Sequence, residues 1–179
     1  MKRVLIAVLM VSALLLTISQ SATANAEEVI PEEYLNGGVL ILGEYGVGLA
    51  WYLDKSSVRI EQEGPPQYII SFQMFPTRYD RNTGETTRVF DGHRAKCMYD
   101  VEKDAMYFFN TGFQPVADWA YIDPVGPAGE SPIDTLGEMA WYILYQKPFY
   151  GGRKWRDGNG QMRWSNYGEE LYRRIDNSY

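Results

Sequence analysis

The feature that most restricts the fold is a strict alternation of side-chain character in residues 67–75, "QYIISFQMF". In an extended chain, every second side chain lies on the same face. One face of this segment carries Tyr68, Ile70, Phe72 and Met74. An α-helix cannot gather such a set on one side, because its neighbours recur every three or four residues. The segment is therefore predicted to be a β-strand with one buried face.

Similar short runs, separated by turn residues, extend from residue 38 to residue 123. "GGVLILGE" and "VGLAWYLD" stand on either side of Tyr45 and Gly46, a gap typical of a hairpin. The partner of the first strand is predicted in residues 87–100, after a turn in "PTRYDRNTGET", and "DAMYFFN" then returns after "VEK". Consecutive hairpins of this kind predict an antiparallel meander.

One helix is predicted after the strands, in residues 131–148. Ser131 can cap its N-terminus, Pro132 suits the first helical position, and Pro148 ends it. Asp134 favours the positive end of the helix dipole. The spacing of three and four residues predicts a buried stripe of Leu136, Met139, Ala140, Ile143 and Leu144. A helix packed on a preceding sheet predicts an α+β fold.

The N-terminus has the pattern of a signal peptide. Lys2 and Arg3 precede an apolar run over residues 4–18, and Ala-Asn-Ala places cleavage after Ala26. The mature chain is predicted to begin with a flexible acidic arm, residues 27–37, and to have no transmembrane segment, because no second run of that length follows. The expected location is the periplasm or the exterior. No lipid anchor is expected, since the cleavage site lacks cysteine.

The mature chain is long enough for a single α+β domain, predicted to span residues 38–179. Its 15 Lys and Arg against 23 Asp and Glu give a formal net charge of −8, which disfavours a nucleic-acid partner. The single cysteine, Cys97, cannot close an internal disulfide. We expect it to be a buried small hydrophobic residue, the alternative being a nucleophile.

Three motifs, "WYLDKSSV", "KCMYD" and "DWAYIDPVGPAGESPIDTLGEMAWYIL", make residues 47–146 resemble the surface-adhesin-E-like group of small exported bacterial proteins. The group's "yyDxxSI" motif corresponds to Tyr52, Asp54, Ser57 and Val58. The resemblance implies an exported module, and the named member of the group is an adhesin that binds host matrix and plasma components. This chain departs from the group in two respects. The helix ends in "AWYILYQKP" without the second cysteine that can pair with the one in "KCMYD", and the signal lacks a lipoprotein cysteine. Host adhesion is therefore not carried over.

The segment around Asp54 is predicted to be a structural corner between strands, because Asp54 and Ser56 can accept hydrogen bonds from nearby backbone amides. The catalytic alternative makes Asp54 an acid or base and Ser57 a nucleophile, but no third partner stands at a telling distance. His93 is the only histidine. In a strand it would lie about 13 Å from Cys97, too far for a hydrogen-bonded dyad, so we expect a surface residue.

No metal or cofactor is predicted. A zinc site needs more ligands than one histidine and one cysteine. "DRNTGE" has the oxygen-bearing Asp80 and Asn82 of a calcium loop but lacks the closing glutamate, so a hairpin turn is expected. A glycosidase needs two carboxylates facing one cleft. The candidate groups are Glu61 with Glu63, and Asp100 with Glu102 and Asp104.

The C-terminal segment, residues 149–179, contains seven aromatic residues and has a net charge of +2, which favours docking onto the acidic remainder. "RDGNGQ" predicts a hairpin with Trp155 and Trp164 on its two arms. The aromatics either complete the core or form a stacking platform for sugar rings or a partner peptide. The candidate ligand-binding residues are Trp155, Trp164, Tyr150 and Tyr167.

Two function classes follow. The first is an exported, non-catalytic binding or interaction module of the bacterial envelope, whose partner is another envelope or extracellular protein or a glycan. The second is an envelope hydrolase that uses paired carboxylates or His93. An aromatic groove without a perturbed titratable cluster would favour the first, and two carboxylates converging in a cleft would favour the second.

Overall fold

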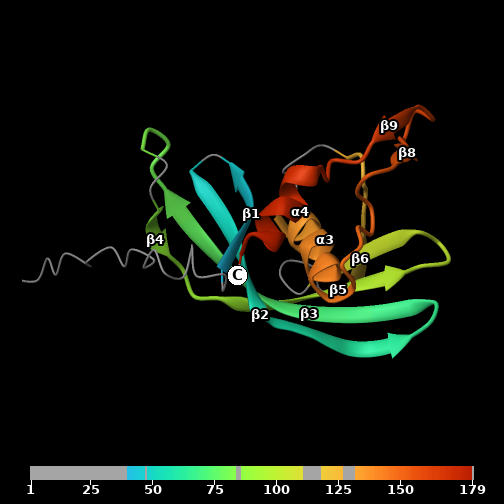
Figure 1. Ribbon diagram of the computed structural model, residues 1–179, viewed down its shortest axis with the longest axis horizontal. Helices are drawn as coiled ribbons and strands as arrows, with labels where there is room; N and C mark the ends of the chain where they lie inside the picture. Colours follow the sequence, from blue (N-terminus) through green and yellow to red (C-terminus); the bar gives the residue numbers. More distant parts are fainter. Residues whose placement is uncertain (1–39, 47, 84–85, 111–117, 127–131, 179) are drawn as a thin grey trace, which may run out of the picture.

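The computed structural model describes residues 40–46, 48–83, 86–110, 118–126 and 132–178. Seven strands form one antiparallel sheet in the order β1-β2-β3-β5-β6-β7, with β4 paired to β3 (Figure 1). The strands are β1 (Leu40–Gly46), β2 (Leu49–Gly64), β3 (Gln67–Tyr79), β4 (Thr86–Val89), β5 (His93–Asp100), β6 (Ala105–Asn110) and β7 (Asp118–Ile122). The predicted meander is confirmed, and the predicted partner of β3 is divided into β4 and β5.

The first hairpin turns later than predicted. Tyr45 and Gly46 still belong to β1, where they pair with Ala50 and Leu49 of β2. The positive φ of 81° that the turn requires is adopted by Gly48, a conformation that a residue without a Cβ reaches at no steric cost. The turn therefore lies between Gly46 and Leu49, and the prediction of a turn at Tyr45 and Gly46 was wrong.

The corner predicted at Asp54 lies inside one strand, because β2 continues through it. The pairing register with β3 shifts between Asp54 and Arg59, which is a β-bulge. Asp54 Oδ1 accepts hydrogen bonds from the Ser56 backbone N–H at 2.8 Å and from its hydroxyl at 2.6 Å. Ser57 Oγ donates to the Asp54 carbonyl at 2.6 Å and accepts from the Gln73 backbone N–H at 2.7 Å. The bend thus stays in the sheet, held by local side-chain bonds.

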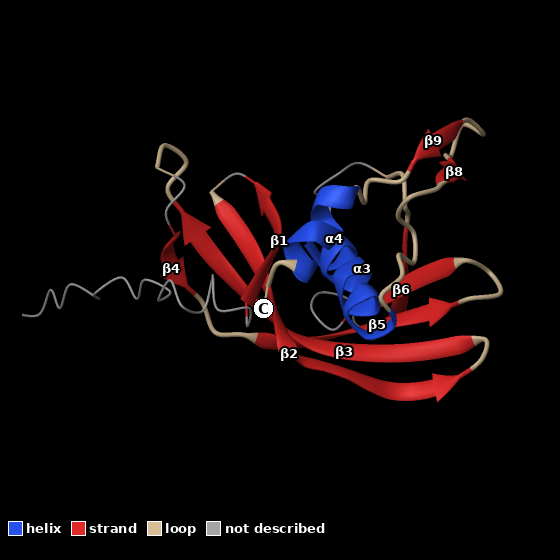
Figure 2. Cartoon of the chain, viewed as in Figure 1, coloured by secondary structure: helices blue, strands red, loops and turns tan. Residues whose placement is uncertain are grey.

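Helix α3 (Pro132–Tyr145) covers one face of this sheet (Figure 2). Leu136, Met139 and Ala140 are buried as predicted, and Ile143 and Leu144 are half-buried. The helix ends before Pro148, because Gln146 adopts a φ of 53° and its side-chain amide bonds the carbonyls of the last turn. The predicted bounds, 131–148, were therefore too wide at the C-terminal end. Ser131, the predicted cap, lies outside the described residues.

A second helix, α4 (Glu169–Asp176), corrects the prediction of a single helix. It has acidic residues in its first turn and arginines in its last, as the helix dipole favours. Leu171, Tyr172 and Ile175 form its buried stripe. Lys55 Nζ donates to the carbonyls of Ile175 and Ser178, both at 3.3 Å, which ties the helix end to the bulge of β2. The C-terminal segment therefore docks on the domain, as its charge predicted.

The core lies between the inner face of the sheet and the helices. The predicted inner face of β3 is confirmed, since Ile70, Phe72 and Met74 are buried. Helix α3 comes close to β5 and β6 at Gly137, where an added Cβ would lie 2.9 Å from Met106 Sδ and 3.0 Å from Cys97 Sγ. Cys97 is buried and free, as expected of a packing residue.

The predicted signal peptide, residues 1–26, and the predicted acidic arm, residues 27–37, lie outside the described residues. Neither α3 nor α4 has the length and apolar character that a membrane span needs, and no other helix of the described chain does.

Candidate functional site

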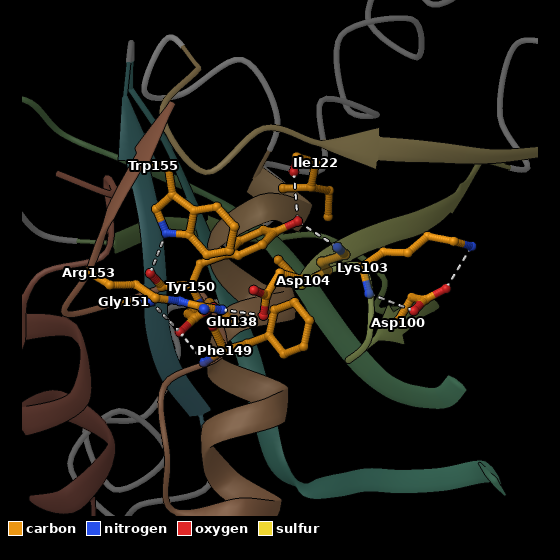
Figure 3. Close-up of polar contacts among 11 residues, drawn as sticks. Asp100, Lys103, Asp104, Ile122, Glu138, Phe149, Tyr150, Gly151, Arg153 and Trp155 are labelled. Carbon is orange, nitrogen blue, oxygen red and sulfur yellow. Dashed lines mark hydrogen bonds and ion pairs between the residues drawn. The ribbon is translucent and has the colours of Figure 1, made fainter. Parts of the chain in front are cut away.

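A buried carboxylate fixes the start of the aromatic C-terminal segment. Glu138 of α3 has no exposed surface. Its Oε1 accepts hydrogen bonds from the N–H groups of Phe149 at 2.8 Å and Gly151 at 3.2 Å, and from the Tyr172 hydroxyl at 2.7 Å. Its Oε2 accepts from the Tyr150 N–H at 2.9 Å (Figure 3). One side chain thus holds together α3, the chain that follows it and α4.

The pKa of Glu138 is raised above its usual value because burial disfavours the charged form. The hydrogen bonds from Tyr172 and from the three backbone N–H groups act in the opposite direction. Both carboxylate oxygens accept hydrogen bonds from donors of the protein itself, and the side chain is buried. Glu138 therefore acts as a structural anchor.

Two of the predicted ligand-binding residues belong to the core. Tyr150 and Tyr167 are buried, and their rings stack at 6.1 Å between centroids with an interplanar angle of 19°. The Tyr150 hydroxyl donates to the Ile122 carbonyl at 3.0 Å and accepts from the Met106 backbone N–H, so it joins β6 to β7 (Figure 3). These two rings belong to the core cluster, and the prediction that they bind a ligand stays a prediction.

Trp155 is half-buried at the base of a small hairpin formed by β8 (Lys154–Arg156) and β9 (Met162–Trp164). Its indole N–H donates to the Tyr150 carbonyl at 2.9 Å. The Trp155 ring meets the Tyr150 ring edge-on at 4.8 Å between centroids, and the Arg153 guanidinium lies over the Trp155 ring at 4.2 Å. Arg153 also bonds Asp104 Oδ1 at 2.9 Å. Trp155 thus attaches the hairpin to the domain.

The hairpin predicted from "RDGNGQ" is confirmed, with Trp155 and Trp164 on its two strands. Asp157 Oδ1 accepts from the N–H groups of Asn159 at 2.9 Å and Gln161 at 2.8 Å, which closes the turn. Asp157 Oδ2 pairs with Arg163 Nε at 2.8 Å. The turn is therefore stabilised by the side chain of Asp157, a residue of the turn itself.

One face of the hairpin is exposed to solvent. The register pairs Lys154 with Trp164 and Arg156 with Met162, so these four side chains share a face, here called the outer hairpin face. Trp164 is 64% exposed and Met162 is 54% exposed. Lys154 Nζ lies 5.3 Å from the centre of the Trp164 ring. The prediction that Trp164 binds a ligand stays a prediction, and its position makes the ring accessible.

A second exposed aromatic surface lies on the face of the sheet opposite the helices. The register places Ile69 opposite Met98, Met98 opposite Tyr107, and Tyr107 opposite Tyr121. This row crosses β3, β5, β6 and β7, and beside it Phe109 pairs with Trp119. We name these six residues, Ile69, Met98, Tyr107, Phe109, Trp119 and Tyr121, the outer aromatic patch.

The rings of the outer aromatic patch contact one another in pairs. Tyr107 and Tyr121 meet at 5.8 Å between centroids, and Phe109 and Trp119 at 5.1 Å. Tyr121 is 55% exposed, and the other members are half-buried. None of the six belongs to the core cluster, whereas Phe108, the intervening residue of β6, packs against it. The patch therefore presents apolar and aromatic surface outside the core.

Charged side chains border the patch on β2 and β5. Ser71 is buried, donates its hydroxyl proton to Glu61 Oε1 and accepts from Arg94 at 2.6 Å. Lys96 Nζ lies 4.0 Å from Glu61 Oε2. The hydrogen bond from Ser71 and the nearby Lys96 and Arg94 hold the pKa of Glu61 below its usual value. This mixed-charge network gives the apolar patch a polar rim.

The histidine, serine and cysteine of the hydrolase alternative each have structural contacts. His93 is exposed, and its ring contacts Trp51 edge-on at 6.5 Å between centroids. Ser57 Oγ donates to the Asp54 carbonyl of the bulge and accepts from the Gln73 backbone N–H of β3. Burial raises the pKa of the Cys97 thiol, which disfavours the nucleophilic thiolate.

The candidate carboxylates also have structural partners. Asp100 accepts from the Lys103 N–H at 3.1 Å and pairs with its ammonium at 2.9 Å, contacts that hold its pKa below the usual value (Figure 3). Asp104 pairs with Arg153. Asp80 Oδ1 accepts from the N–H groups of Asn82 and Thr83, as in a plain turn. Within the described ranges, no group of three or more His, Cys, Asp or Glu side chains is placed to hold a metal ion.

Sequence reasoning missed the outer aromatic patch and Glu138. The patch had a signal: "DAMYFFN" and "DWAYI" are apolar at both odd and even positions, whereas a strand with one solvated face alternates. Glu138 had a weaker signal, as a lone acid between Leu136 and Met139 of the predicted buried stripe.

No family model, curated protein or solved structure matches this chain. The resemblance to the surface-adhesin-E-like group therefore stays a prediction.

Proposed function

We propose that this protein is an exported, non-catalytic binding module of the bacterial envelope that contacts a partner protein through the outer aromatic patch. The observation that supports the proposal is the patch itself: four aromatic rings on the face of the sheet opposite α3. The export signal predicted over residues 1–26 supports the location, and the resemblance of residues 47–146 to exported bacterial modules agrees with it.

The composition of the patch favours a protein over a glycan. Tyr, Trp, Phe and Met are the residues enriched in the buried centre of protein–protein interfaces, with polar groups around them. The patch has this arrangement, because Ile69 and Met98 lie two residues along β3 and β5 from Ser71 and Lys96, which belong to the network of Glu61, Arg94 and Lys96. A sugar stacks on ring faces and hydrogen-bonds to polar groups beside them. Ile69 and Met98 offer neither, yet they continue the same row.

The hydrolase remains the second function class, but no arrangement among the described residues favours it. His93 packs against Trp51, and the serine and the carboxylates form contacts that serve a bulge, a turn or the hairpin base. A binding role requires no such convergence, only exposed surface that a partner can cover.

Site-specific photocrosslinking tests the proposal. A photoreactive amino acid at position 121, in the full-length exported chain, should give a covalent adduct with one protein of the producing cell or its medium. The same amino acid at Arg173, an exposed position on α4, is the matched control and should give none. The partner is then purified and its dissociation constant measured with the unmodified protein.

Tyr121→Ser and Phe109→Ser should each weaken that binding roughly tenfold or more, the effect of truncating an interface hot spot. Thermal melts should show that both variants remain folded, since neither ring belongs to the buried core cluster. Tyr121→Ser also removes a hydroxyl that hydrogen-bonds Tyr150. Unchanged affinity in both variants would refute the assignment of the patch. Binding on a glycan array that Tyr121→Ser abolishes would identify a glycan instead. Hydrolytic activity that His93→Ala abolishes would establish the enzyme alternative.

A further inference from the structure

We propose that the outer hairpin face is a membrane-contact element that binds the anionic surface of a phospholipid bilayer, a role separate from the protein-binding function proposed above. The element consists of Lys154, Arg156, Met162 and Trp164. It is built into an ordered hairpin, because Asp157 closes the turn and pairs with Arg163 on the opposite face.

The hairpin and the residues that flank it are positively charged. Residues 153–165 carry four cations, Arg153, Lys154, Arg156 and Arg163, and one carboxylate, Asp157. Their net charge of +3 compares with −6 for the whole chain, so the remainder carries −9. Positive charge is thus concentrated on a hairpin of an otherwise acidic protein. Cations near a bilayer are attracted to anionic lipid headgroups.

Two of these cations remain available. Arg153 pairs with Asp104, and Arg163 with Asp157. Lys154 and Arg156 form no ion pair with any carboxylate of the described residues, and both side chains are exposed. They also lie on the same face as the exposed Trp164 and Met162. The cations without a carboxylate partner and the exposed apolar side chains therefore lie on the same face of the hairpin.

The chemistry of the face fits a bilayer interface better than a soluble anion. Tryptophan is enriched at membrane–water interfaces, where its ring reaches the headgroup level. Long basic side chains cover apolar surface while their charged ends stay in water or at phosphates. Lys154 over the Trp164 ring shows this arrangement. A small anion would use the cations but would leave Trp164 and Met162 exposed.

An acidic protein and an anionic membrane repel each other, but the position of the hairpin limits this repulsion. Figure 1 shows β8 and β9 standing out from the sheet and from both helices. Screening at physiological salt acts over about 8 Å, so a projecting hairpin can meet the headgroups while the acidic body is screened from them. Its base is held by Trp155 on Tyr150 and by Asn166, whose amide donates to the Gly126 carbonyl at 2.7 Å.

Vesicle co-sedimentation tests the proposal with the processed, full-length protein. Vesicles of phosphatidylethanolamine with 30% phosphatidylglycerol are compared with vesicles of phosphatidylcholine alone, each at 50 mM and 500 mM NaCl. We expect binding to the anionic vesicles at low salt, loss of most of it at high salt, and little binding to the neutral vesicles. Brominated lipid should quench tryptophan fluorescence in the unmodified protein and clearly less in Trp164→Leu.

Lys154→Glu should lower the partition coefficient roughly tenfold, whereas Arg173→Glu, the same charge change on the exposed side of α4, should have a much smaller effect. Trp164→Ser should also weaken binding. Lys154→Glu and Trp164→Ser should melt like the unmodified protein, since both side chains are exposed. Failure to bind anionic vesicles at low salt, or equal losses in Lys154→Glu and Arg173→Glu, would overturn the proposal. So would concentration-dependent self-association that Lys154→Glu abolishes without any vesicle binding, because the acidic body of a second copy would then be the occupant.

Discussion

Replacing Glu138 by glutamine changes one acceptor atom and little else, which makes it the sharpest probe of how the C-terminal segment is held. The glutamine carbonyl can keep the three hydrogen bonds now made to Oε1, from Phe149, Gly151 and Tyr172. Its amide nitrogen then faces the Tyr150 N–H, now bonded to Oε2 at 2.9 Å. A donor would oppose a donor, and one buried N–H would lose its partner.

Leaving one buried donor unsatisfied costs about 1–3 kcal/mol, so Glu138→Gln should lower the free energy of unfolding by that amount. Glu138→Ala removes the acceptor of all four donors. At the lower end of the same range, this costs about 4 kcal/mol or more. For a domain of this size, the melting temperature should then fall by about 8–16 °C.

The pH dependence supplies a second readout. The folded-state pKa of Glu138 is raised, chiefly by burial. The folded protein therefore retains a proton at pH values where the unfolded chain has released it. The resulting stabilisation is complete below the unfolded pKa of about 4.3 and is lost as the pH rises through the folded pKa. Glutamine does not titrate, so the stability difference between the wild type and Glu138→Gln should narrow as the pH rises through this window.

Urea denaturation followed by tryptophan fluorescence, at several pH values between 4 and 8, measures these quantities. Glu170→Gln, the same change at an exposed position of α4, is the control. It removes only an exposed ion pair with Arg173 and should cost much less than Glu138→Ala. If Glu138→Ala lies within about 1 kcal/mol of the wild type, the carboxylate does not organise the segment. If the difference for Glu138→Gln widens with pH, the four donors outweigh burial and the folded pKa is lowered.

Further predictions concern the core and the N-terminus. Gly137→Ala should lower the free energy of unfolding by about 1–3 kcal/mol, because the new Cβ meets Met106 Sδ and Cys97 Sγ. The loss should be smaller when Cys97 is also replaced by alanine. If urea denaturation shows that the losses of the two single variants simply add in the double variant, the close approach is contradicted. Cys97 should react with thiol reagents only after unfolding, so rapid labelling of the native protein would exclude its burial. Mass spectrometry of exported protein should find Glu27 as the first residue, and an intact N-terminus would refute export through this signal.

Part of this fold could be predicted because its causes are local. The alternation of Ile70, Phe72 and Met74 requires only that a strand have two faces, and the structure buries these side chains. The hairpin between Trp155 and Trp164 depends on its own turn residues. Helix α4 escaped prediction because only Leu171, Tyr172 and Ile175 mark its buried face, too short a pattern to detect in an aromatic segment.

The candidate surfaces depended on contacts between distant residues. Sequence supplied the aromatics but not the side of the core on which each would lie. Tyr150 is a core residue, and its hydroxyl bonds the carbonyl of Ile122, which lies 28 residues away in the chain. Tyr121, not considered as a ligand-binding residue, became exposed because the helices cover the opposite face of its sheet.

The sequence by itself determined the period of each strand, the place of most turns and the segregation of positive charge near the C-terminus, since each is a property of neighbouring residues. The tertiary structure alone decided which face of the sheet the helices cover. It also decided that Glu138 meets donors 11 to 34 residues away, and which of the predicted aromatics, Tyr150 or Trp164, a partner can touch. These outcomes arise from packing between elements, because burial depends on what covers a side chain and not on the residues beside it in the chain.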